Sequence, residues 1–377
     1  MPCRVGLCLV CLLACAAEFW AQDLGNMQIH GFVTQGFLYS SNNNYLTMNS
    51  SSGSLQWTEG AISLTDPVTD NLRVGVQLHM FQMGQVGGPN VQLDWASGDY
   101  QVNDNLGFRA GKVKIPLGLY NESQVVDPLF LWILLPQSIY PTDNRDFDLA
   151  VLGGEVYGSI DLGKRGGRLH YSGFAGENRL DANGGYVEQL QGYGLTFPTP
   201  PGGKAYGGDM RWGWRGLMVG ASAQCQALDG TGPDGSLHLP TDLSLVYFAD
   251  WKRGRWDVTG EYIRTPFVAR LTIESTVVPL QFDQRGWYPM VIYRVTDKLH
   301  VGSYYSHYVN KAQDTSLPAN YAKDWAISGR YDFNAYFYAK LESHFLHGDG
   351  LGYYASVNPN GLKPDSNMLA ARVGFVF

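Results

Sequence analysis

Charged side chains recur at every second position in several segments of this sequence, opposite a row of apolar residues. In 336–344, Lys340 and Glu342 fall on one side, and Phe337 and Leu341 fall on the other. With the two-residue period of a β-strand, such charges share one face of a sheet. Their chemistry is electrostatic, because they attract or repel ions in water or pair with one another across a wall. The set comprises Arg73, Arg109, Asp257, Glu261, Lys340, Glu342 and Arg372.

The residue pattern does not indicate catalytic or metal chemistry. The eight histidines lie in no nucleophile motif, and no Gly-rich phosphate loop joins a strand to a helix. His344 and His347 are three positions apart, so a strand directs them to opposite faces. We therefore expect no enzyme, no metal site and no cofactor. The net charge of −7, from 27 basic and 34 acidic residues, argues against a nucleic-acid partner.

Short alternating segments separated by turn signals predict the strands that carry these charges. The clearest is 71–80, where Leu72, Val74 and Val76 alternate with Arg73 and Gly75. Segments 163–167 and 251–255 look like tight turns, whereas 178–203, 227–240, 267–284 and 348–366 look like long loops. The predicted strands lie near 27–40, 55–65, 71–80, 91–95, 106–111, 151–161, 168–176, 206–215, 217–226, 242–250, 255–264, 287–294, 300–309, 324–331, 335–346 and 368–377.

The composition indicates that these strands cross a membrane. The chain has 46 Gly, 23 Tyr, 17 Phe and 10 Trp, and only 16% of its residues are charged. Tyr and Trp favour membrane interfaces. No apolar run beyond the N-terminal segment approaches the ~20 residues of a membrane helix. Apart from a helix, a closed barrel is the structure that pairs every backbone N–H and C=O group within lipid. We therefore predict a transmembrane antiparallel β-barrel of about 16 strands, within about 14 to 18.

The N-terminal segment has the features of an export signal. Arg4 precedes an apolar stretch at 5–17, and cleavage after Ala21 would leave one barrel domain at 22–377. Cleavage after Ala16 or Ala17, or lipid attachment at Cys15, also fits the residues. Four of the five cysteines lie in this segment, which leaves no disulfide in the mature chain. The barrel must therefore hold together by backbone pairing and burial.

The final strand, 368–377, ends on an aromatic residue. Leu369, Ala371 and Val373 share one face with Phe375 and Phe377. This ending resembles the closing strand of bacterial outer-membrane barrels. The resemblance implies that Phe375 and Phe377 serve as a signal to the barrel assembly machinery. It also implies outer-membrane lipid as the surroundings and the bacterial outer membrane as the location.

A second resemblance is carried by the passage from Phe108 to Glu122. The pattern Gly-x-x-Lys-x-Pro-x-Gly-Leu, here from Gly111 through Pro116 and Gly118, resembles the phosphate-selective porin O and P family and its porin-like relatives. That resemblance implies an outer-membrane pore and a homotrimer. Independently of the family, Pro116 cannot donate to a strand ladder, so pairing must stop or reach an edge there.

A long loop at about 116–149 follows this passage. Its segment Leu129–Leu135 is apolar without alternation and lies between two prolines. It is too short to span a bilayer. It can fold back and narrow the lumen, cap the outer mouth or pack against a neighbouring subunit. If it narrows the lumen, the candidate constriction residues are Asp127, Asp143, Arg145 and Asp146.

Barrel size then predicts function. About 16 strands leave an aqueous channel, whereas about eight would be filled by side chains. We expect passive diffusion of small hydrophilic solutes or ions, with selectivity set by the lumen charges. For any single charge, a wall-stiffening ion pair is the competing role. Phosphate selectivity would need a ladder of Arg and Lys, which the sequence lacks. Two alternatives remain: a plugged or scaffolding barrel, and a secreted β-rich glycan-binding protein that stacks sugars on Trp and Tyr.

Overall fold

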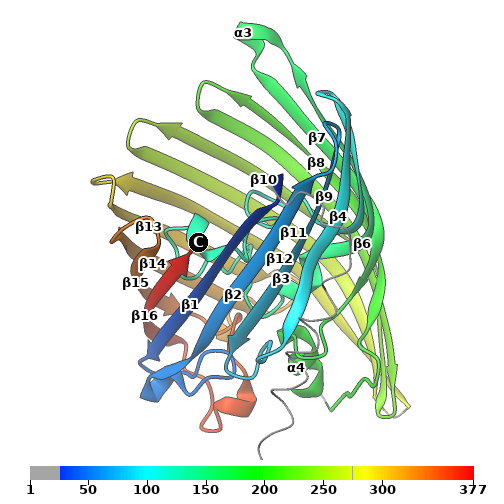
Figure 1. Cartoon of the computed structure of the whole chain (residues 1–377). Helices are drawn as coiled ribbons and strands as arrows, with labels where there is room; N and C mark the ends of the chain where they lie inside the picture. The colour runs from blue at the N-terminus through cyan, green and yellow to red at the C-terminus, as the bar shows by residue number, and fades with distance from the viewer. Residues whose placement is uncertain (1–25, 193, 274) are drawn as a thin grey trace, which may run out of the picture.

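The computed structural model is a closed barrel of 16 antiparallel strands, in which every strand pairs with its chain neighbours and β1 pairs with β16 (Figure 1). It describes residues 26–377 except 193 and 274. The predicted export signal and its cleavage or lipidation sites lie outside the described residues. The predicted fold class and strand number are confirmed. Closure leaves no sheet edge exposed, so a secreted sandwich is excluded.

The strands are unequal in length, and those of the middle of the chain are the longest. Their bounds are β1 Gln28–Ser40, β2 Ser54–Pro67, β3 Leu72–Met83, β4 Val91–Asn103, β5 Leu106–Lys114, β6 Ala150–Asp161, β7 Arg168–Arg179, β8 Gly202–Trp214, β9 Leu217–Gly232, β10 Gly235–Arg253, β11 Trp256–Ile273, β12 Thr276–Arg294, β13 Leu299–Asn310, β14 Tyr321–Asp332, β15 Phe337–His347 and β16 Asp365–Val376.

The helical elements are short and lie in the connections. They are η3 Ser50–Ser52, η4 Asp127–Leu129, α2 Arg145–Asp148, α3 Gly163–Gly166, α4 Gly185–Gly192, η5 Pro318–Asn320 and η6 Ala355–Val357. In the described part of the chain, no helix has the length and apolar character needed to cross a membrane.

The outer surface of the barrel is apolar, as a wall in lipid requires. On β15 and β16 the outward side chains Leu341, Phe345 and Val373 are more than half exposed, whereas the inward Lys340 and Glu342 are buried. The chain end completes the seam, because the Phe377 N–H donates to the Gly31 carbonyl at 3.0 Å and Gly31 returns the bond. Phe375 packs on Phe337 with ring centroids 4.9 Å apart. The assembly role of the terminal aromatics stays a prediction.

The two ends of the barrel differ, as in outer-membrane barrels. Short turns, including the one with α3, lie at the top of Figure 1, and the long loops lie at the bottom. Two segments read from the sequence as loops are instead strand hairpins. Residues 227–240 belong to β9 and β10, and 267–284 belong to β11 and β12 except at their tips.

These hairpins form because alternate side chains along them are buried. Leu228, Leu237 and Leu271 pack with Val187 and Leu190 of α4. The apolar period of two therefore continues beyond the membrane-spanning part of the strands, on a face that a folded loop covers. The Gly and Pro residues of these segments obscured that period in the sequence.

The connection between β5 and β6, residues 115–149, lies inside the barrel; we call it the inner loop. One side of it, Leu131, Trp132, Leu135, Ile139 and Tyr140, packs on inward residues of β12, β13 and β14. The other side, Ile133 and Leu134, packs among inward residues of β1, β2, β3 and β16 and the 41–53 loop. The sequence left three positions open for the 129–135 segment: in the lumen, over the outer mouth or against a neighbouring subunit. The structure shows the segment within the lumen.

Candidate channel interior

Lys340 on β15 fastens the start of the inner loop to the wall. Its ammonium lies 3.0 Å from Asp127 Oδ2 and donates to the carbonyls of Asp127 at 2.9 Å and Trp132 at 3.1 Å. The Asp127 carboxylate also accepts from the Tyr338 hydroxyl at 2.6 Å. Three acceptors for one ammonium compensate for the loss of water around a buried charge.

Arg372 on β16 extends this attachment to β2. Its guanidinium donates to Asp127 Oδ1 at 2.6 Å and to Glu59 Oε2 at 3.3 Å, and it lies over the Trp57 ring at 4.2 Å. Arg145, near the end of the inner loop, pairs with Glu59 at 2.9 Å. Two of the predicted constriction residues, Asp127 and Arg145, are thus joined to the wall through one buried network.

Two wall carboxylates hold the middle of the loop. Glu342 accepts the backbone N–H groups of Ile133 and Leu134, both at 2.9 Å. Glu261 accepts the Tyr140 hydroxyl at 2.6 Å and the Leu119 N–H at 3.0 Å. These bonds satisfy loop backbone groups that strand pairing cannot reach and that water does not contact.

The structure therefore corrects the expected role of four wall charges. Glu261, Lys340, Glu342 and Arg372 point inward, as the period of two predicts, but all are at most 4% exposed. They lie beneath the inner loop and cannot contact a solute in open water. The sequence could not show this because no local pattern reveals which part of the wall a distant loop will cover.

The remaining predicted constriction residues lie at the loop's far end. Asp143 is buried and accepts from Gln189 of α4 and from Tyr354 of the 348–364 loop, both at 3.1 Å. Burial raises the pKa of the Asp143 carboxyl above its ordinary value. Asp146 lies in α2, and its side chain is outside the described part of the structure. Asp148, at the end of α2, accepts from the wall residue Gln224 at 2.9 Å.

The opposite side of the barrel keeps partly exposed charges; we call the inward-facing residues of β3–β8 the polar wall. Arg109 on β5 donates to Asp99 at 3.3 Å and to Glu155 at 3.0 Å, and it lies 4.4 Å over the Tyr157 ring. Its side chain remains 34% exposed. Arg73 is exposed on β3, directly opposite Asp99 in the register.

A second group of the polar wall faces the inner loop. Arg211 on β8 pairs with Asp209 on the same strand and with Glu122 of the inner loop, the latter at 3.2 Å. The Glu122 side chain is 37% exposed, so this ion pair between the loop and the polar wall is accessible to water. Lys114 pairs with Asp94 on β4. The last predicted candidate, Asp257, lies near the short-turn end of β11, 3.5 Å from Lys252.

Sequence reasoning missed most of the polar wall and the loop carboxylate that pairs with it. Asp99, Glu122, Glu155, Asp209 and Arg211 were not singled out. Asp209 and Arg211 are two apart and so share a face, a signal that the sequence did contain. Glu122 carried no such signal, because it belongs to an irregular loop whose path is set by contacts with distant strands.

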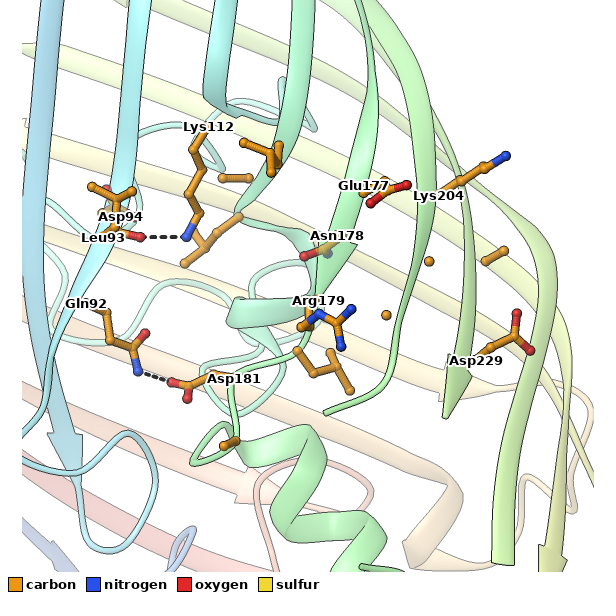
Figure 2. A pocket seen from close by; sticks show the side chains of 18 of the residues that line it. Gln92, Leu93, Asp94, Lys112, Glu177, Asn178, Arg179, Asp181, Lys204 and Asp229 are labelled. Atoms are coloured by element: carbon orange, nitrogen blue, oxygen red, sulfur yellow. Dashed lines mark hydrogen bonds between the residues drawn. The ribbon is translucent and has the colours of Figure 1, made fainter. Parts of the chain in front are cut away.

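Two cavities adjoin the polar wall on either side of Lys112. One, of about 280 Å³, is lined by Arg73, Asp99, Arg109 and Glu122. The other, of about 840 Å³, is shown in Figure 2 and lies toward the long loops. In Figure 2, Lys112 points from β5 toward β4, where its ammonium donates to the Leu93 carbonyl at 2.5 Å.

The larger cavity adjoins the place where β4 and β5 cease to pair. Pairing of β4 with β5 stops at Ala96 and Lys112, although β4 begins at Val91. The cavity is therefore lined both by inward residues such as His79 and Asn178 and by outward residues such as Leu152. The cavity thus lies near the point where the chain leaves β5 to form the inner loop.

Solved outer-membrane proteins have a similar fold, although their sequences are distant. An outer-membrane-expressed OmpT of Vibrio cholerae matches with a TM-score of 0.57 at 11% identity, over 96% of this chain and 100% of that chain. OmpF of Salmonella typhi, in complex with daunomycin, matches with a TM-score of 0.59 at 12% identity, over 94% and 99%. The outer-membrane channel DcaP of Acinetobacter baumannii matches with a TM-score of 0.55 at 12% identity, over 93% and 97%.

No protein-family model matches the sequence, and the search of curated proteins gave no match. The chain has the fold of porin-like outer-membrane barrels. This fold and the apolar outer surface agree with the predicted location in the bacterial outer membrane. Within residues 26–377, apart from the two undescribed positions, no three His, Cys, Asp or Glu side chains are grouped to hold a metal ion.

Proposed function

We propose that the protein is a channel of the bacterial outer membrane for passive diffusion of small hydrophilic solutes or ions, with no enzymatic activity. The observation that carries this proposal is the asymmetry of the interior. The inner loop covers one side of the lumen with buried contacts, whereas Arg109 and Arg211 of the polar wall, and Glu122 of the loop that faces it, are partly exposed. A wall of half-hydrated charges is what a water-filled passage requires.

The charges of this passage predict weak ion preference. Arg109, Lys114 and Arg211 each lie within ion-pair distance of at least one carboxylate. Paired charges of both signs favour neither cations nor anions strongly. The passage thus differs from the unpaired basic ladder that phosphate selectivity needs. We propose that the resemblance to the phosphate-selective porin family reflects the turn from β5 into the inner loop rather than a shared solute.

Single-channel recording tests the proposal. The refolded protein is inserted into a planar bilayer under a salt gradient, with and without added phosphate. We expect stepwise conductance, a reversal potential near zero and little block by phosphate. A correctly folded barrel that inserts without any current would contradict the channel proposal.

One observation favours the second candidate, a plugged barrel with a scaffolding role. The inner loop packs against wall residues on both of its sides, with Leu131 and Trp132 in one cluster and Ile133 and Leu134 in the other. If this packing closes the lumen, the same recordings will be silent. In that case, deleting 129–135 will introduce current that the intact chain lacks.

We also propose the partners that the sequence suggested. The apolar outer surface supports contact with outer-membrane lipid, and the terminal Phe375 and Phe377 support recognition by the barrel assembly machinery. A homotrimer is the assembly that the family resemblance implies. Cross-linking in native membranes measures the number of copies, and removal of Phe377 should lower the amount of folded barrel.

A further inference from the structure

A cluster of basic side chains lies on the outside of the barrel, away from the lumen. The basic patch consists of Arg264, Arg285, Lys311 and Lys323. Arg264 on β11 is directly opposite Arg285 on β12. Lys311 directly follows β13 and donates its backbone N–H to the Asp283 carbonyl at 2.9 Å. Lys323 on β14 is opposite His307 on β13. The patch thus covers four neighbouring strands.

Exposed aromatic residues place the patch at a definite depth. Tyr262, Trp287 and Trp325 are at least 36% exposed. Each lies two positions from Arg264, Arg285 or Lys323 on the same strand, so each aromatic and its basic neighbour share the outward face. In each of these three pairs, the aromatic residue lies closer than its basic neighbour to the short-turn end of the barrel. Because outward Tyr and Trp mark the headgroup level of a bilayer, the basic groups lie among or just beyond the headgroups on the long-loop side.

The patch has an excess of positive charge. Its carboxylate, Asp283, bonds Arg264 at 2.8 Å and Arg285 at 2.6 Å. No described carboxylate is within ion-pair distance of Lys311 or Lys323. Between these groups, His307 Nδ1 is buried without a hydrogen-bond partner among the described residues. By contrast, the outward basic residue Lys204 on β8 is opposite Glu177 on β7.

We propose that the basic patch binds the phosphate groups of a phosphorylated lipid in the outer leaflet of the membrane. Guanidinium and ammonium groups are the usual ligands of phosphate oxygens. The exposed Trp325 and Ile327 on β14 lie on the short-turn side of the patch and offer a surface for the acyl chains. A lipid satisfies both features at once, whereas a free anion would use only the charges. The inference rests on the membrane location of the barrel and not on its conductance.

Binding of fluorescent lipid A to the full-length barrel in neutral detergent tests the proposal. The patch variant is Lys311→Gln with Lys323→Gln. The matched control is Arg179→Gln with Lys204→Gln, which removes two basic residues from the outward face near β7 and β8. Each basic group near an anionic surface contributes roughly a fivefold factor, so the patch variant should bind about 25-fold more weakly. The control should bind like the unmodified protein.

A change in the opposite direction provides an independent check. Asp283→Asn removes the carboxylate that competes with phosphate for the two arginines, so it should tighten binding several-fold. Dephosphorylated lipid A should bind all variants equally and weakly. Equal loss in the patch and control variants would overturn the proposal, as would tight binding of the dephosphorylated lipid. Displacement by millimolar inorganic phosphate would show a simple anion site instead.

The experiment separates this proposal from the channel proposal. The patch lies outside the lumen, so the patch variant should keep the conductance of the unmodified protein in bilayers of neutral lipid. Absence of current with lipid binding intact would count against the channel alone. Loss of lipid binding with heat-modifiable migration unchanged would show that the variant is folded and that the patch carries the binding.

Discussion

The two sides of the barrel interior use similar residues for different purposes. On the anchoring wall, formed by inward residues of β11–β16 with β1 and β2, Lys340 and Glu342 are buried and bond the inner loop. On the polar wall, Arg109 and Arg211 also pair with carboxylates but remain partly exposed. Residue type does not distinguish the walls. Coverage by the inner loop does, because it decides whether a charge meets backbone groups or water.

Burial also decides how much the ion pairs of each wall contribute to stability. A buried ion pair gains little relative to water, yet the loss of one partner leaves an uncompensated charge that is costly. A partly exposed pair is screened and contributes little to stability, but its charge acts on passing ions. The anchoring wall should therefore control the position of the inner loop, and the polar wall should control selectivity.

The largest effect is expected from Lys340→Met on the anchoring wall. The change removes the cation held by Asp127 and the donor to the Trp132 carbonyl. It should lower the free energy of unfolding by about 3–5 kcal/mol, the usual cost of leaving a buried partner unpaired. The loosened loop should also produce larger and noisier single-channel currents. Urea unfolding in lipid vesicles and bilayer recording measure the two effects.

Lys252→Met is the matched control, because the Lys252 side chain is 58% exposed although it pairs with Asp250 and Asp257. Its loss should change the unfolding free energy by about 1 kcal/mol or less. Equal destabilisation by the two substitutions would show that burial beneath the inner loop does not set the cost of losing a paired lysine.

The extent to which the sequence predicted these walls depends on the range of the contacts involved. Strand number and the inward direction of Lys340 and Glu342 follow from alternation, which is local, and closure follows from the need to pair every backbone group in lipid. The hairpins of β9–β12 were missed because Gly and Pro at 227–240 and 267–284 outweighed the alternation of Leu237 and Leu239. Burial of Glu342 could not be predicted, since its partners Ile133 and Leu134 are distant in the sequence and follow no period.

An intermediate effect, on ion preference rather than stability, is expected from Glu122 of the inner loop. Glu122→Gln removes an exposed carboxylate that faces Arg211, so the passage gains net positive charge. The reversal potential in a salt gradient should shift toward anion selectivity, and Glu122→Lys should shift it further in the same direction. The unfolding free energy should change by less than about 1 kcal/mol. An unchanged reversal potential in both variants would mean that ions do not pass Glu122.

The smallest effect is expected from pH at the far end of the inner loop. Burial, and then the nearby charge of Asp242, raise the pKa of Asp148 to about 7 from an ordinary value of 3.8. If the loop end leaves the wall, Asp148 meets water and recovers its ordinary pKa. The docked state therefore holds the proton more tightly, and its stabilisation is complete below 3.8, falls as pH rises and is lost above about 7.

Because the pKa of Asp148 is raised in the docked state, the loop end should be held less firmly at alkaline than at acidic pH. Brief current fluctuations should be more frequent at about pH 8 than at about pH 5, and Asp148→Asn should remove most of this difference because the amide does not ionise. The substitution retains a carbonyl oxygen for Gln224, so the wall contact can persist. If Asp148→Asn keeps the full pH dependence, the titrating group lies elsewhere. The wall near Asp148 would then hold the loop end by side-chain packing, as the apolar cluster around Leu131 and Ile139 does farther along the loop.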